Sequence, residues 1–141
     1  MEVKICDLPE GYVPSEQENF MNDLQREYFR RKLVEWRSEL ERENGDVIKY
    51  LQQEERSCND EADRASNETD LAYELRTKER ARKLIRKIDD ALQRIINGTY
   101  GYCEETGEPI SLKRLDARPI ALLSIEAQER HEKQERIQKS N

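Results

Sequence analysis

Two long stretches of this chain, residues 22–56 and 64–97, contain no proline and only one glycine, Gly45. This composition favours continuous helices, since proline and glycine are the residues that most disfavour a helix interior. In the first stretch, mostly apolar residues recur with alternating steps of four and three, the heptad spacing of a coiled coil. This series is Phe29, Leu33, Trp36, Leu40, Glu43, Val47 and Tyr50. The second series steps mostly by three and four, through Leu71, Leu75, Lys78, Arg82, Ile85, Ile88, Leu92 and Ile95.

The two series fit each other if the helices fold back as an antiparallel hairpin. Partners in such a hairpin have residue numbers with a constant sum, and this holds for Phe29–Leu92, Leu33–Ile88 and Trp36–Ile85. Half of that sum falls between Asp60 and Glu61, inside residues 57–63, whose small polar side chains mark a turn. Opposite charges also face each other in this register, because residues 76–87 are mainly basic and residues 39–55 mainly acidic. The basic stretch is therefore interpreted as an internal charge complement, with a nucleic-acid-binding face as the alternative.

The composition limits the class of protein. Charged residues make up 40% of the chain and apolar residues 35%, which suits long helices with narrow seams better than one large core. The net charge of −6 argues against general nucleic-acid binding. No apolar run is long enough to span a membrane, and the N-terminus lacks a signal-peptide pattern. We expect a cytoplasmic protein whose three cysteines, Cys6, Cys58 and Cys103, are reduced.

The expected fold is mainly α, with a long antiparallel coiled-coil hairpin, a small globular domain and a C-terminal helix. Residues 1–21 are predicted to be an N-terminal segment that packs with the globular part. Residues 22–97 form the coiled coil, with its tip near residues 57–63. Residues 98–123 hold three of the five glycines and two of the four prolines, and are predicted to form a compact globular region. Residues 124–141 form the C-terminal helix.

The globular region contains the frame of a zinc site with most of its ligands replaced. Cysteines at positions 103, 106, 124 and 127 would make the pattern C-x2-C-x17-C-x2-C, which is typical of structural zinc. Only Cys103 is present, and the other positions hold Thr106, Ser124 and Ala127. Hydroxyl groups are poor zinc ligands and a methyl group is none.

The chain's one histidine, His131, could add a second ligand, but two ligands do not close a tetrahedral site. We therefore predict a degenerate, metal-free descendant of a zinc knuckle. Apolar packing must then replace the stabilisation that a metal ion would supply. The candidates for this substitute core are Ile110, Leu112, Leu115, Ile120, Leu122 and Leu123.

The predicted tip is acidic, with Asp60, Glu61 and Asp63 close together in the sequence. One interpretation is structural, because aspartate is common in turns and Asp63 could cap the returning helix. The other is functional. A long arm with a carboxylate tip could deliver negative charge into a deep, metal-containing cavity of a partner.

Five segments together resemble the DksA/TraR family of bacterial RNA polymerase-binding transcription factors. They are FRRKLVEWRSEL, DEADRAS, ELRTKERARKLIRKI, GYCEETGEPI and LKRLDARP, and the resemblance runs from about residue 20. It implies a coiled coil that enters the polymerase secondary channel and brings its tip near the catalytic magnesium and trigger loop. With guanosine tetraphosphate, such a factor represses ribosomal RNA promoters and activates others, such as those for amino-acid biosynthesis. The missing cysteines resemble the cysteine-poor branch of the family, which can function without zinc.

The resemblance also implies roles for particular residues. The family's tip residues match Asp60, Asp63 and Ala65. Its polymerase-docking residues match Arg80 and Arg114. Its guanosine tetraphosphate interface matches Leu84, Lys87 and Arg118, while a further basic residue of that interface is replaced by Gln128. The resemblance thus implies a monomer that binds polymerase and this nucleotide, with no stable cofactor and no specific DNA binding.

Two other functions remain open from the sequence. A Gre-type transcript-cleavage factor also places an acidic hairpin tip in the same channel, but it carries a β-rich domain after its coiled coil. A DNA-binding protein could use the basic residues 76–87, although the net acidity argues against it. An enzyme is not expected, because the sequence has no nucleophile–base pair, phosphate-binding glycine loop or complete metal site.

Overall fold

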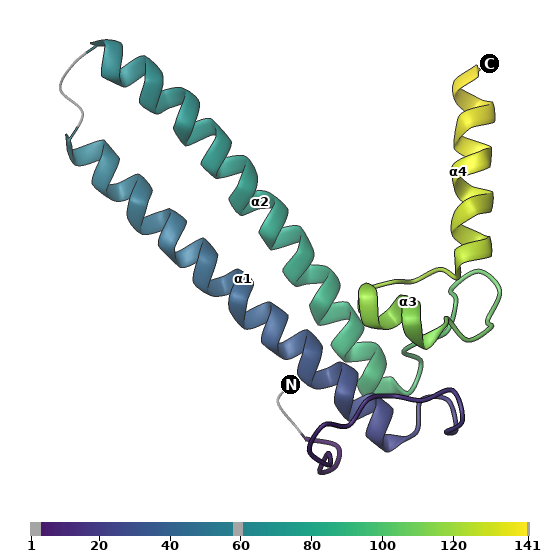
Figure 1. Ribbon diagram of the computed structural model, residues 1–141. Helices are drawn as coiled ribbons and strands as arrows, with labels where there is room; N and C mark the ends of the chain where they lie inside the picture. The colour runs from purple at the N-terminus through teal and green to yellow at the C-terminus, as the bar shows by residue number, and fades with distance from the viewer. Residues whose placement is uncertain (1–3, 58–60, 141) are drawn as a thin grey trace. The chain divides into compact units, whose positions relative to one another are not determined.

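The structure is a computed structural model that describes residues 4–57 and 61–140 of the 141-residue chain (Figure 1). The described part contains four helices: α1 (Asp23–Ser57), α2 (Glu61–Asn97), α3 (Leu112–Ala117) and α4 (Ile125–Ser140). Its strand-like pairing is limited to one isolated bridge between Tyr102 and Pro109. The prediction of a mainly α fold is confirmed. Among the described residues, no helix has the length and apolar character needed to cross a membrane.

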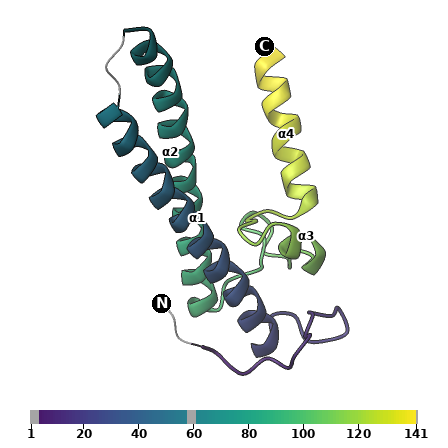
Figure 2. The same ribbon diagram turned by 60° about the vertical axis from the view of Figure 1, so that its left-hand side comes forward.

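The chain divides into two compact units, and both long helices contribute to each of them. We call Met1–Leu33 together with Asp90–Asn141 the base unit, and Val34–Asp89 the arm unit. In the arm unit, α1 and α2 run side by side in opposite directions (Figures 1 and 2). The predicted antiparallel pairing of the two long helices is therefore confirmed.

The arm unit has a narrow buried seam. Leu40 on α1 and Ala81 and Ile88 on α2 are buried, whereas Trp36 and Ile85 are half-buried. The guanidinium Nε of Arg37 on α1 also donates to Oδ1 of Asp89 on α2 over 2.7 Å. The two helices are thus held by a few small or aliphatic contacts and a cross-helix ion pair.

The predicted α2 series was wrong at two positions of this seam. Leu75 is 48% exposed and Arg82 is exposed, while Ala81 is buried instead. Ala81 lies one heptad before Ile88, so both side chains lie on the same buried side of α2. A methyl side chain also lets two helices approach without burying a guanidinium group, which is costly.

The base unit has a core rich in aromatic side chains. Phe29 is fully buried, and its ring centroid lies 5.2 Å from that of Tyr28 and 5.7 Å from that of Tyr100. The hydroxyl group of buried Tyr100 donates to the carbonyl oxygen of Pro119 over 2.7 Å. Of the predicted substitute core, Ile110, Leu115 and Ile120 are buried, whereas Leu112, Leu122 and Leu123 are half-buried.

A buried carboxylate attaches the N-terminal segment to α1 within the base unit. Glu27 is fully buried and accepts hydrogen bonds from the backbone N–H of Ile5, at 3.0 Å, and from the guanidinium groups of Arg30 and Arg31. Burial alone would raise the pKa of Glu27, but these hydrogen bonds lower it to about 2. Glu27 is therefore ionised in the folded protein at neutral pH.

The same unit requires a glycine where α2 leads into the globular region. Gly101 has a φ of 91°, which residues with a side chain rarely adopt. A Cβ atom there would lie 3.0 Å from Cε of Met21 and 3.1 Å from Cζ of Phe20. Position 101 is thus restricted both by its backbone and by the N-terminal segment packed against it.

Candidate functional site

The predicted tip residues are only partly described. Asp60 lies outside the described residues, as do the side chains of Asp63 and Ala65. The backbone places Asp63 and Ala65 inside α2, which begins at Glu61. Asp63 therefore lies in the first helical turn, and the interpretation of this residue as the N-cap was wrong. A carboxylate in the first turn still interacts favourably with the helix dipole.

Three of the predicted site residues share one face of α2 in the arm unit. Arg80, Leu84 and Lys87 are spaced by four and three residues, so they follow one another along the helix surface. Arg80 and Lys87 are exposed, and Leu84 is half-buried. This face thus combines two cationic groups with an aliphatic one.

The other two predicted basic residues lie at α3 in the base unit. The Nε of Arg114 donates to the carbonyl oxygen of Leu123 over 2.9 Å, so part of this guanidinium is used within the fold. Arg118 is the C-cap residue of α3, and its backbone N–H donates to the carbonyl oxygen of Arg114 over 2.8 Å. The Arg118 side chain is exposed and Gln128 is half-buried.

A polar contact that the sequence did not predict fixes α3 to α1 within the base unit. The hydroxyl group of Tyr28 donates to Oδ1 of Asp116 over 2.7 Å, and Nζ of Lys32 donates to the same atom over 2.6 Å. The Lys32 and Tyr28 hydrogen bonds lower the pKa of Asp116. Burial and the Asp116 carboxylate raise the pKa of Tyr28 to about 12. Since Asp116 lies between Arg114 and Arg118, this contact positions the helix that carries both predicted arginines.

The four positions of the degenerate zinc frame lie near one another in the base unit, since Cys103 is hydrogen-bonded to Thr106 and Ser124 and the Ser124 hydroxyl to the backbone of Ala127. Cys103, Ser124 and Ala127 are buried, and Thr106 is exposed beside them. Burial raises the pKa of the Cys103 thiol, but hydrogen bonds from the Thr106 hydroxyl and from the backbone N–H groups of Ser124, Thr106 and Glu105 lower it to about 6. Hydrogen-bond donors thus surround the sulfur atom at the position where a complete four-cysteine frame would hold a metal ion.

These side chains do not fit a zinc ion. Cys103 is the one thiol of the four, and Ala127 offers only a methyl group. The Ser124 hydroxyl accepts a hydrogen bond from the backbone N–H of Ala127 over 3.3 Å, and Nε2 of His131 lies 3.1 Å from Oε2 of Glu105. Across the described residues, no group of three or more histidine, cysteine or acidic side chains could hold a metal ion.

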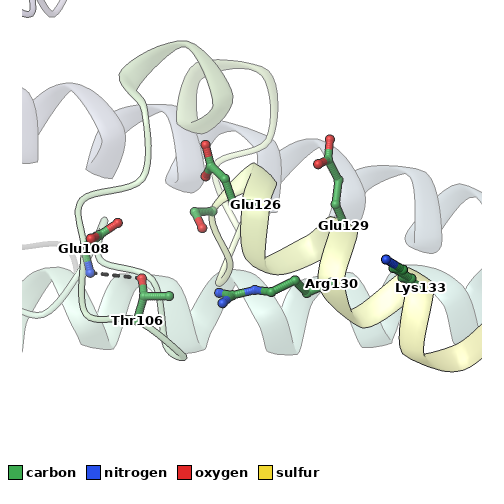
Figure 3. Close-up of a pocket in the computed structure, with 7 residues that line it drawn as sticks. Thr106, Glu108, Glu126, Glu129, Arg130 and Lys133 are labelled. Atoms are coloured by element: carbon green, nitrogen blue, oxygen red, sulfur yellow. Dashed lines mark hydrogen bonds between the residues drawn. The ribbon is translucent and has the colours of Figure 1, made fainter.

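A polar pocket of about 540 Å³ opens beside this frame (Figure 3). It is lined by Thr106, Glu108, Ser124, Glu126, Glu129, Arg130 and Lys133. The Thr106 hydroxyl accepts a hydrogen bond from the backbone N–H of Glu108 over 3.2 Å, and Figure 3 shows the Arg130 guanidinium directed toward Thr106. Three carboxylates, two cations and two hydroxyl groups thus line an exposed polar surface here.

The antiparallel helical hairpin and the degenerate four-ligand frame together define a helical-hairpin protein with a region derived from a zinc finger. Two family models match the chain in the same two places. DnaK suppressor protein DksA, N-terminal domain, matches residues 25–95, and the prokaryotic dksA/traR C4-type zinc finger matches residues 98–133.

Similar proteins agree with this match. The chain is 58% identical to the RNA polymerase-binding transcription factor DksA of Caulobacter vibrioides, over 92% of each chain. It is 39% identical to the factor of the same name from Escherichia coli K12, over 83% of this chain and 78% of that one. The solved structure of transcription factor DksA2 from Pseudomonas aeruginosa matches with a TM-score of 0.80 and 46% identity, over 85% of this chain and 94% of that one. The chain belongs to the DksA family, as its sequence motifs predicted.

Proposed function

We propose that this chain is a transcription regulator that binds bacterial RNA polymerase through the secondary channel. With guanosine tetraphosphate it represses ribosomal RNA promoters and activates others, such as those for amino-acid biosynthesis. The observation that carries the proposal is the 58% identity, over 92% of each chain, to a relative named an RNA polymerase-binding transcription factor. In this proposal the protein is a cytoplasmic monomer without catalytic activity of its own, and it binds no specific DNA sequence.

In this proposal, docking on the polymerase and the effect on its catalytic site depend on different residues. Arg80 on α2 and Arg114 on α3 contribute to docking, while the tip residues Asp60, Asp63 and Ala65 act near the polymerase catalytic magnesium. Arg80 supports this division because it is exposed and thus free to form a charged contact. Arg114 has a second role within the fold through its bond to Leu123, so its replacement would disturb structure as well as docking.

An Asp63→Asn variant tests the division. Asparagine removes one charge at similar size, and the helix dipole interaction that it loses is worth about 0.5 kcal/mol. We expect this variant to bind polymerase nearly as well as wild type and to lose repression of a ribosomal promoter in vitro, with Asp60→Asn less severe. Affinity by competition and promoter output are measured on the same preparations. Full repression by Asp63→Asn would mean that the carboxylate has only a structural role. A loss of affinity in parallel with repression would mean that the tip contributes to docking.

The guanosine tetraphosphate interface is proposed to use Leu84, Lys87 and Arg118. Lysine supplies a compact positive charge, and arginine can form two parallel hydrogen bonds to the same group, so both suit phosphate groups. The test is a titration of the nucleotide in transcription with Lys87→Ala, with Arg82→Ala as a matched control, since Arg82 is an exposed cation on another side of the same helix. Lys87→Ala should require more nucleotide for half-maximal repression, while Arg82→Ala should not. Equal shifts in both would point to general electrostatics. Gln128 in place of a basic residue should weaken the nucleotide response.

We also propose that the protein carries no zinc. The frame holds a single thiol, Cys103, beside Thr106, Ser124 and Ala127, and one thiolate does not make a structural zinc site. Elemental analysis should find less than stoichiometric zinc, and the melting temperature should not change in chelator. A variant with Thr106→Cys, Ser124→Cys and Ala127→Cys is the positive control, because it restores four thiolates. One zinc per wild-type chain, with unfolding in chelator, would contradict the proposal.

The alternatives are separated by direct assays. A transcript-cleavage assay on stalled elongation complexes tests the Gre-type activity. The described part of the chain after residue 97 offers one isolated bridge rather than a β-rich domain, and so gives that alternative no support. Mobility shift of promoter DNA without polymerase tests direct DNA binding, which the net charge of −6 disfavours.

A further inference from the structure

The α2 face that carries Arg80, Leu84 and Lys87 continues toward the start of the helix. Thr77 and Tyr73 extend the same spacing of three and four residues. At ~100° per residue, the five side chains lie within an arc of about 80°, and they follow each other over roughly 20 Å of helix. We call these residues, Tyr73, Thr77, Arg80, Leu84 and Lys87, the α2 stripe. All five belong to the arm unit.

Tyr73 is the unusual member of the α2 stripe, because its side chain is large, partly apolar and 64% exposed. Removing it should therefore cost the hairpin little. The Thr77 hydroxyl donates to the backbone carbonyl oxygen of Tyr73 over 3.1 Å, and this bond uses the backbone, not the ring. A single exposed apolar residue is ordinary on a soluble protein. Its alignment with a second apolar residue and two cations needs a further explanation.

The chemistry around the stripe is that of a protein interface. Tyr73 and Leu84 supply apolar surface, and exposed cations border them: Arg76, Arg80, Lys83 and Lys87. Tyrosine and arginine are enriched among the residues that dominate binding energies, since each offers a large contact area and a directed polar group. The complementary surface is an apolar ledge flanked by carboxylates. The acidic chain as a whole does not favour a nucleic acid as the partner.

We infer that Tyr73 is an anchor residue of this chain for RNA polymerase, inserting into an apolar ledge bordered by acidic groups on the polymerase surface. The inference rests on the proposed function and adds to it a contact residue and the chemistry of its counterpart. On this surface Arg80 guides the arm by charge and Tyr73 supplies desolvated contact, while Lys87 keeps its proposed place at the nucleotide interface. The anchor lies one heptad from Arg80, on the side of the α2 start.

The test compares three variants of the full chain for affinity to the RNA polymerase of the chain's own organism. Tyr73→Ala should weaken binding about 30-fold, the loss typical of a dominant contact residue. Tyr73→Phe should remain within about threefold of wild type, because the ring provides most of the contact. Leu75→Ala is the matched control, since Leu75 is also exposed but lies about 200° around the helix, and its affinity should stay within about twofold. Alanine favours helix more than tyrosine or leucine does, and phenylalanine about as much as tyrosine, so all three variants should fold, as circular dichroism can verify.

Each outcome decides a different point. Tyr73→Ala with an affinity within about threefold of wild type overturns the inference and leaves the proposed function intact. An equal loss in Leu75→Ala also overturns it, because the effect would then belong to no particular face. If wild type itself does not bind polymerase, the proposed function fails and the inference fails with it. If wild type binds single-stranded RNA without polymerase and Tyr73→Ala abolishes this, the partner class is wrong.

Discussion

The base unit and the arm unit use the same two long helices in different ways. In the base unit, side chains as large as Phe29 and Tyr100 are buried, and a carboxylate, Glu27, is buried with them. In the described part of the arm unit, the buried side chains are Leu40, Ala81 and Ile88. Two helices alone can bury only one stripe each, whereas the base unit adds α3, the N-terminal segment and the loops after α2. Each long helix is thus part of a core in one portion of its length and mostly exposed to solvent in another.

Because of this difference, the outer faces of the arm helices can carry binding residues more easily than the base unit can. A half-exposed arm keeps its helices through local backbone hydrogen bonds, which most substitutions on the outer faces leave unchanged. Charged and aromatic side chains such as Arg80 and Tyr73 can then occupy those faces at little cost to stability. The base unit has less freedom, because its polar groups such as Glu27 and Asp116 are committed to internal contacts.

The largest expected effect is in the base unit. Phe29→Ala removes a fully buried ring that packs against Tyr28 and Tyr100. We expect a loss of about 3–5 kcal/mol in the free energy of unfolding, measured by urea denaturation. Val13→Ala is the control, since Val13 is in the same unit but 68% exposed, and it should change stability by less than about 0.5 kcal/mol. Similar losses of stability in both variants would mean that burial of the Phe29 ring is not what stabilises the base unit.

The second prediction concerns the buried carboxylate. Glu27→Gln leaves Arg30 and Arg31 without the negative charge they bond, and should cost about 3 kcal/mol at neutral pH. Hydrogen bonds hold the pKa of Glu27 at about 2, below its usual 4.5, despite burial. A carboxyl with a lowered pKa stabilises the fold above its unfolded pKa and loses this effect as the pH falls toward the folded one. The stability difference between wild type and variant should therefore shrink between pH 4.5 and about 2. A constant difference across that range would mean that the charge does not matter.

A third, smaller effect is expected in the arm unit. Trp36 is half-buried, so Trp36→Ala should cost about 1–2 kcal/mol, less than a fully buried aromatic residue. A double-mutant cycle with Ile85→Ala tests the predicted contact, and a coupling of at least about 0.5 kcal/mol supports it. A loss as large as that of Phe29→Ala would show that the arm has a core equal to that of the base.

The smallest effect is expected at the ion pair between the arm helices. Nε of Arg37 lies 2.7 Å from Oδ1 of Asp89, but about a third of each side chain is exposed (34% and 30%). Arg37→Gln should therefore cost less than about 1 kcal/mol, and the difference should diminish in 1 M salt. Asp89→Asn provides the matched variant from the other side. A loss above about 2 kcal/mol at high salt would indicate a buried network instead.

The sequence was sufficient for the helical hairpin, because heptad spacing and proline-free length are local signals that packing did not override. It was less reliable within the seam, where Ala81 rather than Arg82 is buried. The cost of burying a guanidinium group could have corrected that choice, since the pattern alone treats neighbouring positions as equivalent. The family resemblance supplied the matched basic positions on α2 and α3, and their roles stay predictions.

Other features were not accessible from the sequence. The Asp116 carboxylate bonds Tyr28 and Lys32, more than 80 positions away in the chain, and no periodic pattern links residues so distant. The burial of Glu27 was also missed, because acidic residues in a helix are ordinarily exposed. Its signal was the pair of arginines three and four residues later, Arg30 and Arg31, which can bond one carboxylate together.

Trp36 gives the arm unit a fluorescence signal of its own. It is the one tryptophan of the chain, and it belongs to the arm unit. Four of the six tyrosines belong to the base unit: Tyr12, Tyr28, Tyr100 and Tyr102. Indole emission excited at the red edge of its absorption thus reports on the arm alone, without a label or an engineered probe. Comparing its transition with that of the tyrosine near-ultraviolet signal distinguishes one cooperative unfolding step from early separation of the arm helices.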